Sequence, residues 1–456
     1  MQLSINFVVG ALAAASAVSA NVFRVVPRDA APMPVPQQHQ KRSPAHGFVR
    51  RQTGQTEQSV AKLHGGMSKE CVQPQAADLN GLEQKLPTEW QIASIMKGDQ
   101  QANQVWGDIK NSGIIPNIPP KKAQDQQHSG IDQSFTQSYD KSDPDCWWSF
   151  NKCTQPKHKG IPSDLTTCSE PNTWGLSFDD GPNCTHNEFY DFLQQHKLRA
   201  SLMYIGSNVK LHPFHAQRGI ADGHDICVHT WSHKYTSTMS NDQVFAELFY
   251  TIKAIKAVVG VTPRCWRPPF GDVDDRVRAI AAGLGLRTVV WQEDTHDWET
   301  LEKGTQAINQ NYQNILNKAK QESPMVLTHE INSNSMNEFM SMYPKVKAAF
   351  KNVVPLTACV GATSPYPEKV TYPNFKDFTS GKIDAQGLPD PNQQKINGNP
   401  QFTPTPLAKQ GSGSYMNPSQ KGGSGGGSSS GAAAGPASFG AVALGVVASL
   451  IAFVAI

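Results

Sequence analysis

Short apolar runs alternate with helical patterns over residues 161–361, and this alternation sets the fold class. The clearest helical patterns cover 241–260 and 305–321; Ser240 or Asn241 can cap the first of them and Gly260 can end it. Strands that alternate with helices form parallel βαβ units, so the sequence predicts an α/β domain built as a doubly wound sheet or a barrel. The predicted strands are 174–178, 201–205, 226–228, 264–266, 288–291, 325–327 and 353–356.

Polar clusters follow the predicted strands, each at the point where its strand ends. Five of the seven strands have such a cluster: SFDDGP (177–182), HTWSH (229–233), RPPFGD (267–272), DTHDW (294–298) and LTHE (327–330). Because ligands gather at the carboxyl ends of parallel strands, we expect these side chains to form one site. Randomly placed core polar residues would not concentrate in this way.

Two histidines and two adjacent aspartates within these clusters indicate a metal site. His229 and His233 are four residues apart, so their imidazoles can lie on one face of a turn and share a metal. Asp179 and Asp180 can take different roles, since adjacent strand residues point in different directions. One carboxylate can bind the metal while the other takes a proton from water. Taken alone, the His pair is more often a surface pair, and the tetrapeptide DDGP is more typical of a turn.

Together, the five clusters resemble the motifs of the polysaccharide deacetylases (carbohydrate esterase family 4, the NodB homology domain), and most closely those of the fungal chitin deacetylases. They occur in order over roughly residues 160–360, with no substitution at a catalytic position. The resemblance implies a distorted (β/α) barrel with seven or eight strands. It also implies metal-dependent hydrolysis of the N-acetyl groups of chitin, which yields chitosan and acetate.

The resemblance also implies a role for each residue of the first three motifs. Asp179 is expected to be the general base, and Arg267 to orient and tune it through a charge-assisted hydrogen bond. Asp180, His229 and His233 are expected to bind one metal ion, Zn²⁺ or Co²⁺, with nickel as a further candidate.

The remaining roles concern the oxyanion, the general acid and the acetyl pocket. The resemblance implies that the Phe270 N–H stabilises the oxyanion and that His329 protonates the leaving amine, with Asp297 keeping this histidine charged and oriented. Trp298 and Leu327 are expected to line the acetyl pocket.

The N-terminal end of the chain differs in composition from residues 161–361. Residues 1–20 are apolar and end in the small-residue sequence VSA, which is typical of a secretory signal peptide. Residues 21–160 are rich in Gln, Pro, Ser and Lys, and we expect them to be mostly irregular or disordered. The dibasic pairs Lys41-Arg42 and Arg50-Arg51 could end a propeptide.

The C-terminal end predicts a lipid anchor. Residues 362–430 have the Pro/Gly/Ser-rich composition of a stalk, and 431–456 resemble a glycosylphosphatidylinositol (GPI) attachment signal that is removed. The predicted attachment residue is Ser429, with Ser428, Ser430 and Gly431 as alternatives. A single transmembrane helix is the competing interpretation, but no basic cluster follows the apolar tail. We therefore expect the outer face of the plasma membrane and the cell wall as the location.

The eight cysteines of a secreted chain suggest disulfides. We expect a local bond between Cys146 and Cys153, and a bond between Cys168 and Cys359 that closes the domain. The sequon at Asn183 follows the predicted metal-binding turn, where a glycan could block the cleft, so we expect it to be unoccupied.

The net charge of the chain bears on its partners, and alternative functions also have to be weighed. A net charge of +3 with 17% charged residues gives no reason to expect a nucleic-acid partner. The expected partners are chitin and, through the lipid, the membrane; the chain is expected to be a monomer. The alternatives are a deacetylase of another acetylated polysaccharide and a non-catalytic chitin-binding wall protein. The presence of Asp179 and His329 disfavours the latter, and a non-haem iron oxygenase would have no use for Arg267 and His329.

Overall fold

The computed structural model describes residues 54–71, 76–390 and 395–415. Its centre is a parallel sheet with the strand order β5-β4-β3-β2-β1-β8, beside a parallel pair, β6-β7. The strands are β1 (Thr173–Gly181), β2 (Ser201–Tyr204), β3 (Asp225–Val228), β4 (Cys265–Trp266), β5 (Arg287–Thr288), β6 (Glu293–Asp294), β7 (Val326–Leu327) and β8 (Asn352–Pro355). All seven predicted strands are present, and β6 is additional.

The sheet curls into a half-barrel. Isolated bridges from Gly175 to Met325 and from Asp179 to His329 join β1 to the segment that contains β7. The segment 165–167 makes further bridges to Val289 and Pro324, which connect the β5 side to the β7 side. The predicted distorted barrel class is therefore confirmed.

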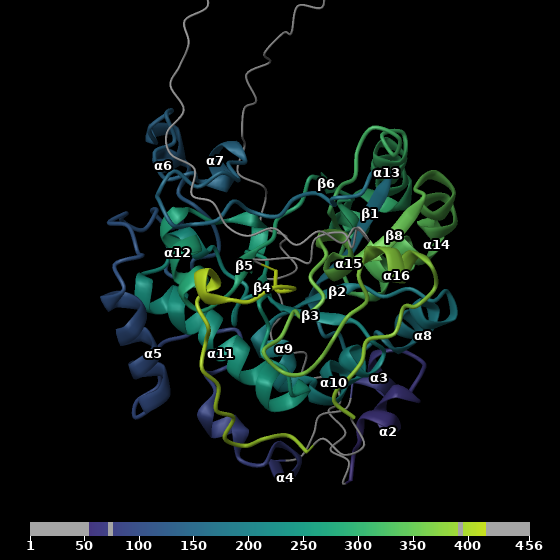
Figure 1. Ribbon diagram of the computed structural model, residues 1–456, viewed down its shortest axis with the longest axis horizontal. Helices are drawn as coiled ribbons and strands as arrows, with labels where there is room; N and C mark the ends of the chain where they lie inside the picture. Colours follow the sequence, from purple (N-terminus) through teal and green to yellow (C-terminus); the bar gives the residue numbers. More distant parts are fainter. Residues whose placement is uncertain (1–53, 72–75, 391–394, 416–456) are drawn as a thin grey trace, which may run out of the picture. The chain divides into compact units, whose positions relative to one another are not determined.

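Helices surround the strands (Figure 1). In this view α11 and α12 lie to the left of the strands, and α13 and α14 lie to the right. The helices of this part are α8 (Asn187–Gln195), α9 (Gly206–Leu211), α10 (Pro213–Ala221), α11 (Asn241–Val259), α12 (Asp275–Gly283), α13 (Thr300–Leu316), α14 (Ser333–Ala349), α15 (Leu356–Val360) and α16 (Phe375–Thr379).

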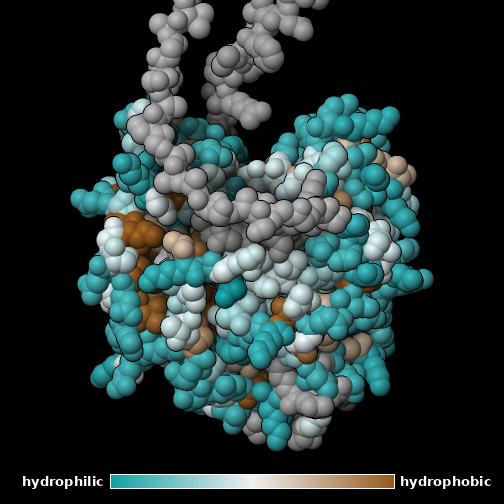
Figure 2. Space-filling model, in the orientation of Figure 1, coloured by the Kyte–Doolittle hydropathy of each residue, from teal (hydrophilic) through white to brown (hydrophobic). Residues whose placement is uncertain are grey.

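Local signals explain the longest helix and the first strand. Ser240 caps α11 in a capping box with Gln243, and Gly260, with a φ of 89°, ends it. All of β1 is buried, including Trp174, Leu176 and Phe178, as expected for a parallel strand covered on both faces. Figure 2 shows mostly hydrophilic residues on the surface, with a hydrophobic group on the side where α5 and α12 lie.

The fold extends upstream of the predicted domain boundary at residue 161. The described part of 21–160 contains α2 (Glu57–Ala61), α3 (Met67–Glu70), α4 (Ala76–Leu79), α5 (Gln100–Asn111), α6 (Gln133–Ser138), α7 (Trp148–Asn151) and the 3₁₀ turn η1 (Leu82–Lys85). Trp106 of α5 is buried and stacks on Phe245 of α11, with ring centroids 4.9 Å apart. The described residues of 54–160 are mostly irregular, as predicted, but the alternative of disorder is wrong there, because a few large side chains such as Trp106 anchor the segment without a long apolar pattern.

The fold also extends beyond residue 361. Tyr366, Tyr372 and Tyr415 are buried, and each makes a hydrogen bond to the segment 224–226. The predicted stalk is therefore wrong over the described part of 362–415, where buried tyrosines hold the chain against the sheet.

Four disulfides pair the eight cysteines. Cys146–Cys153 and Cys168–Cys359 are the predicted pairs, and the other two are Cys71–Cys184 and Cys227–Cys265. The predicted signal peptide, both dibasic pairs and the predicted GPI residues, Ser428–Gly431, lie outside the described residues. Among the residues that are described, no helix is long and apolar enough to span a membrane.

Candidate active site

The polar clusters meet at the carboxyl ends of the strands. Asp179 and Asp180 belong to the end of β1, His229 follows β3, Arg267 follows β4 and His329 follows β7. Each of these residues is at most 8% exposed, so the site is a buried polar cluster.

A bulge at the end of β1 lets both aspartates face the same site. The register between β1 and β2 shifts between Asp179 and Gly181, and Asp180 has a φ of 72°. In a regular strand two successive side chains point to opposite faces. Here Asp179 Oδ2 lies 3.6 Å and Asp180 Oδ1 lies 3.4 Å from Nε2 of His229. The bulge therefore turns the Asp180 side chain so that both carboxylates lie near His229.

Asp180, His229 and His233 could hold a metal ion. Their ligand atoms all lie within 4.8 Å of one another, and Asp180 Oδ1 is 3.0 Å from His233 Nε2. His229 Nδ1 lies 2.7 Å from the carbonyl oxygen of Arg267, to which it donates, so its Nε2 is left as a lone-pair donor. Two imidazoles and one carboxylate suit a divalent transition metal, and three protein ligands leave positions open for water and substrate.

The charge state of Asp180 also suits a role as a metal ligand. Burial opposes its ionisation, but the neighbouring His233 and His229 outweigh that effect and hold the pKa of Asp180 well below its ordinary value of 3.8. The carboxylate is therefore ionised at neutral pH, as metal coordination requires.

Asp179 is held by a buried arginine. Arg267 Nη1 donates to Asp179 Oδ1 at 2.6 Å and to Ser177 Oγ at 3.0 Å. The backbone N–H of Asp179 donates to Thr328, and its carbonyl oxygen accepts from Glu330 N. One carboxylate oxygen is thus fixed by Arg267, while the other, Oδ2, points toward His229.

His329 and Asp297 form the second charged pair. Asp297 Oδ1 accepts from His329 Nδ1 at 2.6 Å, and Oδ2 accepts from the backbone N–H of the same residue at 2.8 Å. Burial lowers the pKa of His329, but the Asp297 carboxylate outweighs it and, with Asp179 and Asp180, raises the pKa to about 10. His329 is therefore protonated at neutral pH, with its ring oriented through Nδ1.

The other predicted site residues lie in two turns and one strand. Phe270 is in η3 (Pro269–Gly271) with a φ of 59°; its ring stacks on Tyr235 and meets the ring of His233 edge-on, at centroid distances of 4.3 and 4.7 Å. Trp298 is half-buried in η4 (Asp297–Glu299), and Leu327 is buried in β7. Among the described ring contacts of these residues, that of Phe270 with His233 is the one that reaches a metal-ligand candidate.

Two further residues at the site were missed from the sequence. Asp272 is fully buried and accepts hydrogen bonds from Trp147 Nε1 and Ser149 Oγ. Glu330 is fully buried, with Oε2 3.1 Å from His186 Nδ1. Asp272 is the last residue of the motif RPPFGD, and Glu330 is the last residue of LTHE. The motifs were recognised in the sequence, but no role was predicted for these two carboxylates.

The Asn183 side chain is engaged within the fold. Its Nδ2 donates to the carbonyl oxygen of Ile331 at 2.7 Å, and its Oδ1 accepts from the backbone and hydroxyl of Thr185 at 2.8 Å. The occupancy of the sequon stays a prediction.

Comparison with known proteins decides the family. The family model described as polysaccharide deacetylase matches residues 166–289. Chitin deacetylase 2 of Cryptococcus neoformans var. grubii is 45% identical over 338 residues, which cover 72% of this chain and 73% of that protein. The chain belongs to the polysaccharide deacetylase family.

Other relatives share parts of this polysaccharide deacetylase. The chitin deacetylase of Amylomyces rouxii is 46% identical over 250 residues, covering 54% of this chain and 59% of that protein. The structure of the chitin deacetylase from the fungal pathogen Colletotrichum lindemuthianum is 22% identical with a TM-score of 0.42, covering 45% of this chain and 95% of that one. The family match and the two relatives at 45% and 46% identity, both named chitin deacetylases, show that this polysaccharide deacetylase is an enzyme of the hydrolase class.

Proposed function

We propose that this polysaccharide deacetylase hydrolyses the N-acetyl groups of N-acetylglucosamine residues in chitin, releasing acetate and leaving chitosan. One observation carries the proposal: the Asp179–Arg267 pair and the protonated His329–Asp297 pair lie with the three metal-ligand candidates at the same strand ends. The names of the relatives, which are chitin deacetylases, support chitin as the polymer.

Asp180, His229 and His233 would hold one divalent cation, Zn²⁺ or Co²⁺. When bound, such a cation supplies Lewis-acid activation of water and of the acetyl carbonyl group. The chain prepares for it by keeping Asp180 ionised and by directing Nε2 of His229 into the site.

Asp179 acts as the general base in this proposal. Arg267 occupies Oδ1, so Oδ2 is the oxygen that can accept a proton from the attacking water. The water oxygen then bonds to the acetyl carbon. Arg267 keeps the carboxylate in place through a charge-assisted hydrogen bond with no exposure to solvent.

His329 acts as the general acid. Its Nδ1 is bound by Asp297, so Nε2 is the atom that can give a proton to the glucosamine nitrogen as the C–N bond breaks. A pKa of about 10 keeps that proton available at neutral pH. Acetate and a free amine are the products.

Phe270, Trp298 and Leu327 complete the proposed site. The Phe270 N–H is proposed to stabilise the oxyanion, and the left-handed backbone at this residue supports a constrained role. Trp298 and Leu327 are proposed to line the acetyl pocket.

Acetate release from defined polymers tests the proposal. The full chain is treated with chelator and titrated with Zn²⁺ while acetate is measured from N-acetylated chitin oligomers and from acetylated xylan. We expect activity on the chitin oligomers to disappear with chelator and to return at about one zinc per chain. Activity on acetylated xylan alone would contradict chitin as the substrate, and activity that resists chelation would contradict the metal site.

The sequence supports a place for this reaction at the cell surface. We infer that the chain acts as a monomer at the outer face of the plasma membrane and in the cell wall, anchored by a GPI lipid near Ser429. The signal-like residues 1–20, the apolar residues 439–456 and the pairing of the cysteines support this inference. Phosphatidylinositol-specific phospholipase C should release the protein from cells; retention after complete digestion would contradict the anchor.

A further inference from the structure

The segment 143–151 packs directly against the proposed active site, although it lies upstream of residues 166–289, which match the family model. We propose that Trp148 of this segment is a positioning residue for the reaction: it fixes the oxyanion turn Pro269–Gly271 and, through Trp291, the arginine that holds the base. This inference rests on the proposed function, since it concerns the roles of Phe270, Arg267 and Asp179.

The first contact is with the turn itself. Phe270 and Gly271 have φ angles of 59° and 70°, so two successive residues are in the left-handed region. For a phenylalanine this conformation is unfavourable and persists only where the surroundings enforce it. The Trp148 ring lies against Gly271 so closely that a Cβ built there would come within 2.3 Å of it. The turn is thus held by the Trp148 ring on one residue and by Tyr235 and His233 on the other.

The second contact leads toward the base. The ring centroids of Trp148 and Trp291 are 4.7 Å apart, and the Trp291 centroid is 6.0 Å from Arg267 Cζ. Arg267 in turn donates to Asp179. A displaced Trp148 would therefore loosen the packing on both the oxyanion turn and the base–arginine pair.

Trp148 is anchored to the residues that follow the turn. Its backbone N–H donates to the carbonyl oxygen of Val273 at 3.0 Å. Its neighbours, Trp147 and Ser149, both donate to Asp272 Oδ1, at 3.0 and 2.7 Å. Asp272 has no exposure, so these bonds are made away from solvent.

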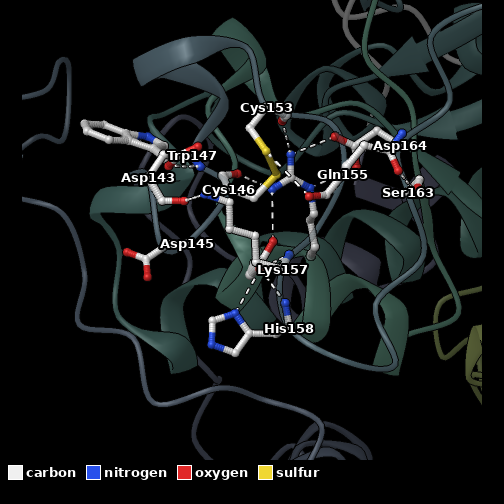
Figure 3. Close-up of a disulfide and its surroundings, with 12 residues drawn as sticks. Asp143, Asp145, Cys146, Trp147, Cys153, Gln155, Lys157, His158, Ser163 and Asp164 are labelled. Atoms are coloured by element: carbon white, nitrogen blue, oxygen red, sulfur yellow. Dashed lines mark hydrogen bonds and ion pairs between the residues drawn. A yellow bond between two sulfur atoms is a disulfide. The ribbon is translucent and has the colours of Figure 1, made fainter. Parts of the chain in front are cut away.

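A disulfide and a buried arginine hold the segment from its other side. Figure 3 shows the Cys146–Cys153 disulfide with Trp147 beside it. Arg278 of α12 donates to the carbonyl oxygens of Cys146 and Cys153 at 2.6 and 2.8 Å, and to both oxygens of Asp164. The segment is therefore a fixed part of the domain.

A matched pair of tryptophan variants in the full chain tests the proposal. Trp148 and Trp106 are both 3% exposed and both lie upstream of residue 161, but Trp106 packs on Phe245, away from the site. We expect Trp148→Leu to lower kcat about tenfold with KM changed less than about twofold. Trp106→Leu should lower Tm comparably while kcat stays within about twofold of wild type. Trp148→Phe, which keeps a ring over Gly271, should recover most of the lost kcat.

The outcomes separate this inference from the proposed function. Equal kcat values for Trp148→Leu and Trp106→Leu in an active wild-type background would overturn the inference and leave the deacetylase proposal standing. A wild-type chain that releases no acetate from chitin oligomers would overturn both. If Trp148→Leu does not fold, Ser149→Ala decides: loss of its bond to Asp272 should lower kcat about threefold, and an unchanged kcat contradicts the inference.

Discussion

The barrel strands and the upstream segment 121–160 serve the same site but are stabilised in different ways. Strand β1 is buried along its whole length and carries Asp179 and Asp180 at its polar end. The upstream segment contributes short helices, and buried polar bonds hold it together with an aromatic cluster and a disulfide. Lys121, 4% exposed, lies 2.5 Å from Asp145, and Arg278 donates to the carbonyl oxygens of Cys146 and Cys153 at 2.6 and 2.8 Å.

The difference shows how one site can combine hydrophobic and polar support. Apolar burial gives the strands a fixed frame for the reacting groups. Polar bonds have strict geometry, and those of the upstream segment to Asp272 and Val273 hold the residues that directly follow the turn Pro269–Gly271. Buried ion pairs, however, depend on both partners, because removing one leaves an uncompensated charge.

Removing one disulfide from each region should give the largest difference in stability between the two regions. Cys168–Cys359 spans 191 residues and Cys146–Cys153 spans 7. From the loop-closure entropy, replacing the first pair by serine should lower the free energy of unfolding by about 5 kcal/mol and replacing the second by about 2.5 kcal/mol. Urea unfolding measures both. A larger loss for Cys146→Ser with Cys153→Ser would break the comparison.

Breaking the ion pair at the junction between the two regions should have the next largest effect. Arg278→Ala leaves Asp164 buried without its partner and should cost about 3 kcal/mol of stability. Arg199→Ala is the control, because its partner Asp384 is largely exposed, and it should cost less than about 1 kcal/mol. Similar losses in the two variants would mean that Arg278, which also donates to the carbonyl oxygens of Cys146 and Cys153, does not hold the upstream segment.

The pH dependence of the His329–Asp297 pair tests the contribution of the barrel strands alone. Asp297 raises the pKa of His329 to about 10, from an ordinary value of 6.5. The resulting stability is fully present below pH 6.5 and is lost as the pH rises through about 10. Asp297→Asn should therefore shift the alkaline limb of kcat/KM downward, with activity at pH 9 falling about tenfold more than at pH 6.

A neighbouring carboxylate provides the control for that shift. Glu299→Gln changes a residue of the same turn that contacts Lys303 and His296 rather than His329. Its alkaline limb should stay in place. An unchanged limb in Asp297→Asn would remove His329 from the role of general acid.

The strand ends could be predicted because their signals are local. Each apolar run is followed by its polar residues within a few positions, as with Leu176 and Asp179. The β6 strand was missed because Glu293 and Asp294 are polar and the strand has only two residues. The bulge at Asp180 was not predictable either, since it depends on pairing with β2.

The upstream segment could not be predicted because its contacts are distant in sequence. The bond from Arg278 to Cys146 joins residues 132 positions apart, and Trp147 reaches Asp272 over 125 positions. Composition alone made this region resemble a disordered tract. The Cys71–Cys184 pairing likewise depends on the fold and has no signal in the spacing.

The separate duties of the two adjacent aspartates are the central claim, and one variant tests it most directly. Asp179→Asn in the full chain should bind about one Zn²⁺ per chain, as wild type does, because Asp180, His229 and His233 are intact. Its rate of acetate release from chitin oligomers should fall about 10³-fold. Near-normal turnover in Asp179→Asn, or loss of its zinc, would contradict the account.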